Sequence, residues 1–220
     1  MIIYLQRHQL ERNKAMKVIA INGSPRKNGN TYLSIKRICD VLEKEGIETE
    51  IIQVGDKTFG GCHACGACGK IGKCAFGDKD GLNEIGEKMV SADGIIIGSP
   101  VYYADINGGL KSFLDRVFYS FGSNFRFKPG AAVVALRRGG AIHAYHSINN
   151  YFGITEMIQV PSMYWNDVHG AAAGECLQDE EAMQMMDALG RNMAYLLKMQ
   201  AESKVQPPEK LPKIKYNFIR

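Results

Sequence analysis

Short apolar segments alternate with amphipathic segments along most of this chain, and this alternation limits the fold more than any other feature. Apolar, β-branched segments typical of buried strands occupy residues 17–22, 47–54, 94–98 and 131–136, with a weaker one at 156–160. Helical spacing of apolar residues occupies 31–45, 80–91, 110–121, 141–152 and 179–199. Such an alternation forms a parallel sheet covered by helices on both faces. We predict an α/β three-layer sandwich with five parallel strands in the order 2-1-3-4-5.

The alternation covers residues 16–200, and both ends of the chain differ from it. Residues 1–15 precede a second methionine, Met16, which leads directly into the first apolar strand, so we expect an N-terminal extension at 1–15. Residues 201–220 contain three prolines that cannot continue the last helix, so we expect a C-terminal tail there. The sequence of 220 residues thus predicts one domain of ordinary size with two tails.

The excess of positive charge lies at the two ends of the chain. The formal net charge is +4, of which residues 1–16 contribute +2 and residues 201–220 contribute +3, leaving −1 for the middle. A nucleic-acid-binding domain concentrates basic residues on its folded surface, so we expect no nucleic-acid partner. No segment has the length of a membrane span or the residue order of a signal peptide. We therefore expect a cytoplasmic protein with no membrane partner.

A glycine-containing turn, Asn-Gly-Ser-Pro-Arg-Lys-Asn-Gly-Asn-Thr at residues 22–31, connects the first strand to the first helix. Unpaired N–H groups and the positive dipole end of a helix make such a turn an anion site. The residues that we expect at the anion are Ser24, Arg26, Asn28, Asn30 and Thr31. The turn lacks the motifs of triphosphate and dinucleotide sites, so a phosphate monoester such as that of FMN fits better. The alternative is an ordinary turn in which Asn30 or Thr31 caps the helix.

Three motifs in this order resemble the NAD(P)H-dependent FMN reductase and iron–sulfur flavoprotein families. Residues 23–31 resemble the loop that binds the FMN phosphate, and Gly-Ser-Pro-Val-Tyr-Tyr at 98–103 resembles the second flavin loop. Leu-Lys-Ser-Phe-Leu-Asp-Arg at 110–116 resembles the helix that follows, and the similarity extends from about residue 16 to 198. The resemblance implies a flavodoxin-like fold, bound FMN and a homodimer or homotetramer with the flavin near an interface.

The second and third flavin loops follow strands three and four. The expected contacts in the second loop are Ser99, Pro100, Val101, Tyr102 and Tyr103, where backbone N–H groups meet the pyrimidine edge of the flavin and a tyrosine covers one face. The resemblance implies that the third loop is Arg137, Arg138, Gly139 and Gly140. Its arginines either attract the phosphate of a nicotinamide substrate or are solvated charges. On the intervening helix, we expect Asp115 and Arg116 to be structural or interfacial.

Four cysteines lie close together in the glycine-rich segment 60–75: Cys62, Cys65, Cys68 and Cys74. Three cysteines at steps of three can reach three corners of one cuboidal cluster, as in bacterial ferredoxins, and the fourth is near enough to complete the set. The arrangement also resembles the compact motif of the iron–sulfur flavoproteins, which implies a 4Fe–4S cluster beside the flavin. A zinc site, which favours two separated cysteine pairs, and a loop without metal are the alternatives. The remaining cysteines, Cys39 and Cys176, are expected to be isolated thiols.

These features predict an FMN-dependent oxidoreductase in which the flavin supplies the chemistry, so no catalytic acid or base is expected. The electron donor is NAD(P)H or a reduced carrier such as ferredoxin, and the acceptor is a flavin, quinone or other small molecule. Two alternatives stay open: an electron carrier that works with ferredoxin, and a redox or metal sensor whose cysteines respond.

Overall fold

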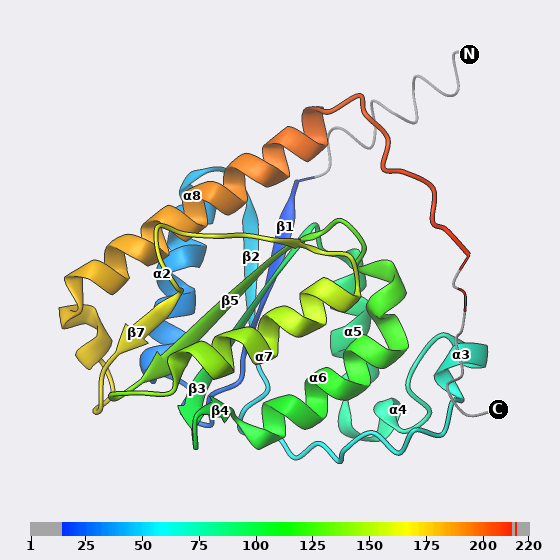
Figure 1. The fold of residues 1–220 in the computed structure, drawn as a ribbon, viewed down its shortest axis with the longest axis horizontal. Coiled ribbons are helices and arrows are strands. Elements are labelled where there is room, and N and C mark those ends of the chain that lie inside the picture. The colour runs from blue at the N-terminus through cyan, green and yellow to red at the C-terminus, as the bar shows by residue number, and fades with distance from the viewer. Residues whose placement is uncertain (1–14, 213, 215–220) are drawn as a thin grey trace.

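The computed structural model describes residues 15–212 and 214, and its centre is a parallel β-sheet (Figure 1). The main strands are β1 (Lys17–Asn22), β2 (Glu48–Gln53), β3 (Gly94–Tyr102), β5 (Pro129–Leu136) and β6 (Ile158–Gln159). They follow the order β2-β1-β3-β5-β6, which confirms the predicted order of five parallel strands and the flavodoxin-like topology. Two short strands extend the sheet: β4 (Asp105–Ile106) runs antiparallel to β3, and β7 (Asp167–His169) runs parallel to β5.

The fifth position of the sheet is shared between β6 and β7, where the sequence predicted one strand at 156–160. β6 pairs with the start of β5, and β7 pairs with its end. Pro161 follows β6 closely and has no N–H for a strand ladder, so the chain leaves the sheet there. Asn166 bridges the interruption, because the Val134 N–H donates to its backbone oxygen (3.0 Å) and its side-chain amide donates to the Ala132 carbonyl (3.0 Å).

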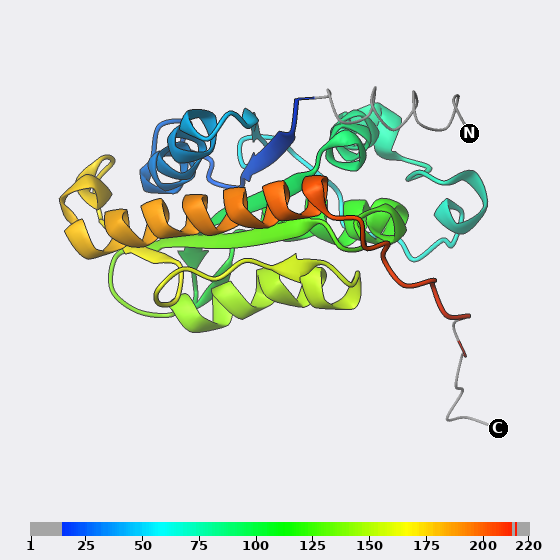
Figure 2. The same cartoon turned by 90° about the horizontal axis from the view of Figure 1, so that it is seen from above.

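Two groups of helices cover the sheet. On one face lie α2 (Asn30–Lys44) and α8 (Glu180–Glu202), which are side by side in Figure 1 and Figure 2. The other face is covered by α5 (Leu82–Ser91), α6 (Gly108–Phe121) and α7 (Ala141–Ile154). The remaining turns are α3 (Cys68–Ile71), α4 (Gly77–Asp80), η1 (Gly122–Asn124) and η2 (Glu175–Gln178). The predicted three layers are thus confirmed, with α3 as a short helix inside the glycine-rich segment 60–75 and α4 directly after it.

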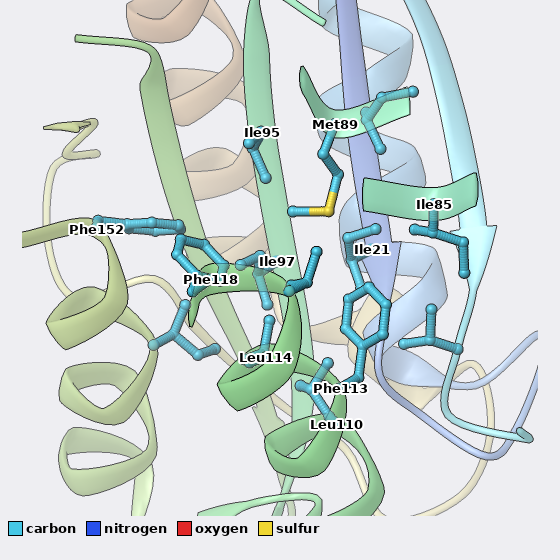
Figure 3. Close-up of a cluster of buried hydrophobic side chains, with 14 of the residues drawn as sticks. Ile21, Ile85, Met89, Ile95, Ile97, Leu110, Phe113, Leu114, Phe118 and Phe152 are labelled. Carbon is cyan, nitrogen blue, oxygen red and sulfur yellow. The ribbon is translucent and has the colours of Figure 1, made fainter. Parts of the chain in front are cut away.

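Alternate residues of each central strand point to the two helical layers. Ile19, Ile21, Ile95 and Ile97 face α5, α6 and α7, whereas Val18, Ala20 and Ile96 face α2 and α8. Figure 3 shows strand isoleucines against Leu110, Phe113, Leu114 and Phe118 of α6. Both faces of β1 and β3 are therefore buried, as their continuous apolar sequences predict. This core fixes the start of α6 relative to the ends of the strands.

The structure describes only part of the two tails that the sequence predicts. The expected extension at 1–15 lies outside the described residues except for residue 15, which precedes β1. Helix α8 ends at Glu202, and residues 203–212 have neither helix nor strand. Among the residues that the structure describes, no helix has both the length and the apolar character needed to cross a membrane.

Candidate functional site

The turn after β1 presents the N-terminal end of α2 without a side-chain cap. Gly29 is the N-cap, with extended backbone (φ −79°, ψ 179°) and no side-chain hydrogen bond to the first turn. The alternative in which Asn30 or Thr31 caps the helix is therefore wrong. The first-turn N–H groups have no partners within a helix, and the helix dipole places positive potential there. The turn has the features of an anion site.

A short hydrogen-bond network fixes the shape of this turn. The Ser24 N–H donates to the Asn22 side-chain oxygen (3.1 Å), and the Arg26 N–H donates to the Ser24 hydroxyl (3.1 Å). Gln53, at the end of β2, accepts from the Asn22 amide (2.6 Å) and donates to the Ser24 carbonyl (2.5 Å). Gln53 was not predicted from the sequence, although the β1–β2 register places it opposite Asn22. The turn is thus held by neighbours on two strands before any ligand binds.

The backbone beyond β2 also approaches the turn closely. A Cβ added at Gly55 would lie 2.3 Å from both the carbonyl carbon and the oxygen of Ser24. Only glycine fits at this contact, because real Cβ atoms do not come so near backbone atoms. Gly55 therefore fixes the distance between the segment after β2 and the turn.

The predicted anion-binding side chains divide into three groups. Ser24 and Thr31 are buried in the turn, whereas Arg26 and Asn28 are exposed. The Asn30 amide is bound to the segment before α8: it donates to the Ala172 carbonyl (3.0 Å) and accepts from the Gly174 N–H (2.9 Å). Asn30 thus connects the start of α2 to the segment between β7 and α8.

The second predicted loop is for the most part strand: β3 continues past the predicted end at residue 98 to Tyr102, and only a tight hairpin turn at Tyr103 and Ala104 separates it from β4. Tyr103 (φ 50°) and Ala104 (φ 61°) both have left-handed backbone, as a two-residue hairpin turn requires. The Ser99 hydroxyl accepts from the Asn107 N–H (3.0 Å), and Asn107 caps α6 by accepting from the Leu110 N–H. The Tyr103 side chain is fully exposed at the tip and Tyr102 is 44% exposed, so the hairpin presents aromatic rings to solvent.

The third predicted loop packs against this hairpin. Gly140 has left-handed backbone (φ 94°), and a Cβ there would lie 2.8 Å from the Ala104 Cα. Arg137, Arg138 and Gly139 are exposed. Near the base of α7, His143 Nε2 lies 3.4 Å from an Asp105 carboxylate oxygen. Burial opposes ionisation of Asp105, but hydrogen bonds from Ser147 and the Ile106 N–H, together with His143, lower its pKa.

The three loops lie together at the carboxyl end of the sheet (Figure 1). The Gly23 N–H donates to the Gly98 carbonyl (2.8 Å), which connects the turn after β1 to the end of β3. The contact of Gly140 with Ala104 connects the second loop to the third. Ligands of open α/β sheets bind at this end. The fold thus brings the predicted flavin loops to one place.

The four clustered cysteines line a single pocket, which we call the cysteine pocket. Its other lining residues are Gly61, His63, Gly66, Ala75, Phe76, Arg116, Tyr119 and Ser120. Cys62 and Cys65 are exposed, Cys68 and Cys74 are half-buried, and none forms a disulfide. Within the described ranges, no three His, Cys, Asp or Glu side chains converge as the ligands of one metal ion. Four cysteine thiols around one pocket are the donor set of a 4Fe–4S cluster and also of a structural zinc ion.

Cys74 is the most tightly held of the four cysteines. Asn83, buried on α5, accepts from the Cys74 N–H (3.0 Å) and donates to the Cys74 carbonyl (2.9 Å). Arg116 donates from both Nε and Nη2 to the Cys74 sulfur, each at 3.4 Å. Neither residue was expected at the cysteines. The motif at 110–116 places Arg116 on a helix, but the sequence does not show which loop that helix contacts.

The cysteine pocket lies along α6, away from the turn that begins α2. Arg116, Tyr119 and Ser120 belong to the second half of α6, whereas its first residue follows the hairpin after β3. Arg116 lies nine positions after the helix cap Asn107, a rise of about 14 Å along the helix. Figure 1 shows α3 at the end of α6 that is farther from β4. Helix α6 therefore connects the cysteine pocket to the second predicted flavin loop.

Known proteins resemble this chain over most of its length. A family model described as NADPH-dependent FMN reductase matches residues 16–172. An iron–sulfur flavoprotein of Methanocaldococcus jannaschii is 38% identical over 192 residues, covering 84% of this chain and 98% of that protein. An iron–sulfur flavoprotein of Methanosarcina thermophila is 34% identical over 184 residues, covering 79% and 95%. These matches confirm the resemblance found in the sequence.

A solved structure of RosB with bound 8-demethyl-8-formylriboflavin-5'-phosphate shares the fold. Its TM-score is 0.65 at 17% identity, with 94% of this chain and 96% of that chain covered. At this level of identity the likeness extends to the architecture alone.

Proposed function

The chain belongs to the NADPH-dependent FMN reductase family, which makes it an FMN-dependent oxidoreductase, and from this premise we propose that the loops after β1, β3 and β5 hold the FMN. The observation that carries the proposal is the uncapped start of α2, which lies with two further loops at the carboxyl end of the sheet. A phosphate monoester matches the free N–H groups and the positive dipole end of this helix.

Each loop has a distinct part in this proposal. In the first, the Ser24 and Thr31 hydroxyls and the α2 N–H groups donate to the phosphate, and Arg26 and Asn28 approach it from the exposed side. Ser99 to Tyr103, which form the end of β3 and the start of its hairpin turn, border the pyrimidine edge of the flavin through their backbone. The third loop approaches through Gly139 and Gly140, while Arg137 and Arg138 attract the phosphate of a nicotinamide donor. We assign Asn30 and Gln53 to holding the turn in shape.

We further propose that Cys62, Cys65, Cys68 and Cys74 hold a 4Fe–4S cluster. Support comes from the common pocket of the four thiols and from the two relatives that are named iron–sulfur flavoproteins. Glycines with left-handed backbone at 66 and 72 let the segment curve tightly between the cysteines. A bound cluster would exchange single electrons, whereas FMN can also accept a hydride.

The reaction that follows is electron transfer from NAD(P)H, or from a reduced carrier, to a flavin, quinone or other small acceptor. NAD(P)H gives up two electrons and one proton as a hydride. Reduction of a quinone to its hydroquinone consumes two electrons and two protons, so solvent supplies the second proton. The protein positions donor and acceptor in turn at the exposed side of the three loops, which needs no acid or base side chain.

A second candidate function is electron transfer between ferredoxin and another protein. The exposed Cys62 and Cys65 favour it, because they leave one side of the cysteine pocket open to a protein partner. The two functions are separated by adding NADH, NADPH or reduced ferredoxin to anaerobic protein and following the flavin absorbance, then adding a quinone. Steady NAD(P)H oxidation with quinone supports the oxidoreductase. Reduction by ferredoxin alone supports the carrier, and protein that does not bind added FMN refutes both.

We also propose a homodimer or homotetramer with the flavin loops near an interface. Tyr102 and Tyr103 support this, because two aromatic side chains at the tip of a hairpin are exposed in the single chain. Light scattering of the purified protein measures the subunit number, and a monomer at all concentrations would refute the proposal.

A further inference from the structure

We propose that Arg116 is a positioning residue that sets the reduction potential of the centre in the cysteine pocket through its hydrogen bonds to Cys74. The inference rests on the cluster proposed above. It concerns Arg116, which the sequence motif placed on a helix without indicating which residues it contacts.

The Arg116 side chain is enclosed and has a fixed orientation. It is 4% exposed, and its Nε and Nη2 both donate to the Cys74 sulfur at 3.4 Å. Its Nη1 donates to an Asp80 carboxylate oxygen (2.5 Å) and to the Gly60 carbonyl (3.3 Å). The guanidinium therefore contacts the beginning of the cysteine segment, its last cysteine, and α4. Such an arrangement leaves little freedom for another rotamer.

The guanidinium keeps its charge in this enclosed position. An arginine guanidinium stays protonated in proteins, and the Asp80 carboxylate forms an ion pair with it. Two N–H groups and a positive charge then face one sulfur in a poorly solvated environment, where electrostatic interactions are stronger than in water. Hydrogen bonds to the ligand sulfurs and local charge are among the factors that set cluster potentials. The reduced cluster carries one more negative charge, so Arg116 favours reduction.

Asp80 acts in the opposite direction. Its carboxylate holds Arg116 and places a negative charge near the same sulfur, with its side chain 22% exposed. Removing the charge of Asp80 should raise the potential, while removing that of Arg116 should lower it. A residue that only supports the fold would not give this pair of opposite shifts.

The test uses full-length protein purified without oxygen, with midpoint potentials measured by titration under electron paramagnetic resonance. Arg116→Gln should lower the cluster potential by at least 59 mV, a tenfold change in the equilibrium constant for one electron, and Asp80→Asn should raise it. Lys70→Gln is the matched control, since Lys70 lies exposed on α3 between Cys68 and Cys74 and water screens its charge. Its shift should be less than half that of Arg116→Gln. Arg116→Lys, which keeps the charge but loses the paired donors, should fall between wild type and Arg116→Gln.

Each outcome is decisive when iron content is measured on every variant. Equal potentials in wild type and in an iron-loaded Arg116→Gln overturn the inference, as do shifts of the same sign for Arg116→Gln and Asp80→Asn. Loss of iron from both Arg116 variants also overturns it. That result would mean that the wild-type Arg116 side chain is needed to keep the cluster bound, and not that it sets the reduction potential. Wild-type protein that binds FMN but no iron refutes the proposed cluster itself.

Discussion

Replacing Gly55 by alanine tests whether the turn after β1 holds the FMN phosphate. The new Cβ would lie 2.3 Å from Ser24 backbone atoms, and ordinary contact begins at 3.4 Å, so the two segments must separate by about 1 Å. A displacement of that size lengthens an N–H···O bond of about 2.9 Å beyond the usual limit of about 3.2 Å. One lost hydrogen bond to a charged phosphate costs about 2 kcal/mol, which corresponds to a Kd for FMN about 30-fold higher.

The matched control is Gly60→Ala, in the same connection after β2. A Cβ at Gly60 has no atom within 4 Å, and its backbone is not left-handed, so FMN affinity should not change. The assay is quenching of FMN fluorescence by flavin-free protein, together with urea unfolding to follow stability. Overpacking at Gly55 should also lower the free energy of unfolding by about 1–3 kcal/mol. A folded Gly55→Ala protein whose Kd lies within threefold of wild type would refute the assignment of the phosphate to this turn.

Two further predictions concern a carboxylate and the thiols. Hydrogen bonds from Lys17 and Lys88 lower the pKa of Glu50, so its ionised form stabilises the fold above the ordinary pKa of about 4.3. The difference in unfolding free energy between wild type and Glu50→Gln should be constant near neutral pH and decline as the pH falls through the lowered folded-state pKa of Glu50. Urea unfolding at several pH values measures this difference, and a difference that grows on acidification would contradict the prediction. Burial raises the pKa of Cys39 to about 12. In metal-free folded protein, iodoacetamide should therefore modify the exposed Cys62 and Cys65 before Cys39, as mass spectrometry would show, and early labelling of Cys39 would argue against its buried position.

The layers were predictable from the sequence because the central strands are apolar on both faces. The strand order was predictable because five alternating strand–helix units fit the doubly wound arrangement. The predicted helix starting at residue 110 begins two residues earlier, since Asn107 supplies the cap. The single strand predicted at 156–160 divides because Pro161 interrupts pairing and the chain rejoins β5 through Asp167–His169. The local sequence pattern of Asp167–His169 does not indicate that these residues pair with β5.

The convergence of the three predicted flavin loops was predictable because the carboxyl ends of strands in a parallel sheet meet at one edge. The assignments of individual side chains to the flavin site remain predictions. For one of them, Asn30, the structure shows that the side-chain amide forms hydrogen bonds with the segment before α8. The partners of the cysteines were not predictable, since Asn83 and Arg116 reach Cys74 from helices that are separated from it in sequence. Contacts of that kind depend on how helices pack, which a single sequence does not display.

The most direct measurement is the content of FMN, iron, sulfide and zinc per chain in protein purified without oxygen. We predict about one FMN together with the four irons and four sulfides of a 4Fe–4S cluster, and loss of iron but retention of FMN in Cys74→Ser. Zinc at one equivalent, or FMN with no iron in protein made under iron-replete conditions, would contradict the cluster. Protein that binds no FMN even after its addition would contradict the flavin site.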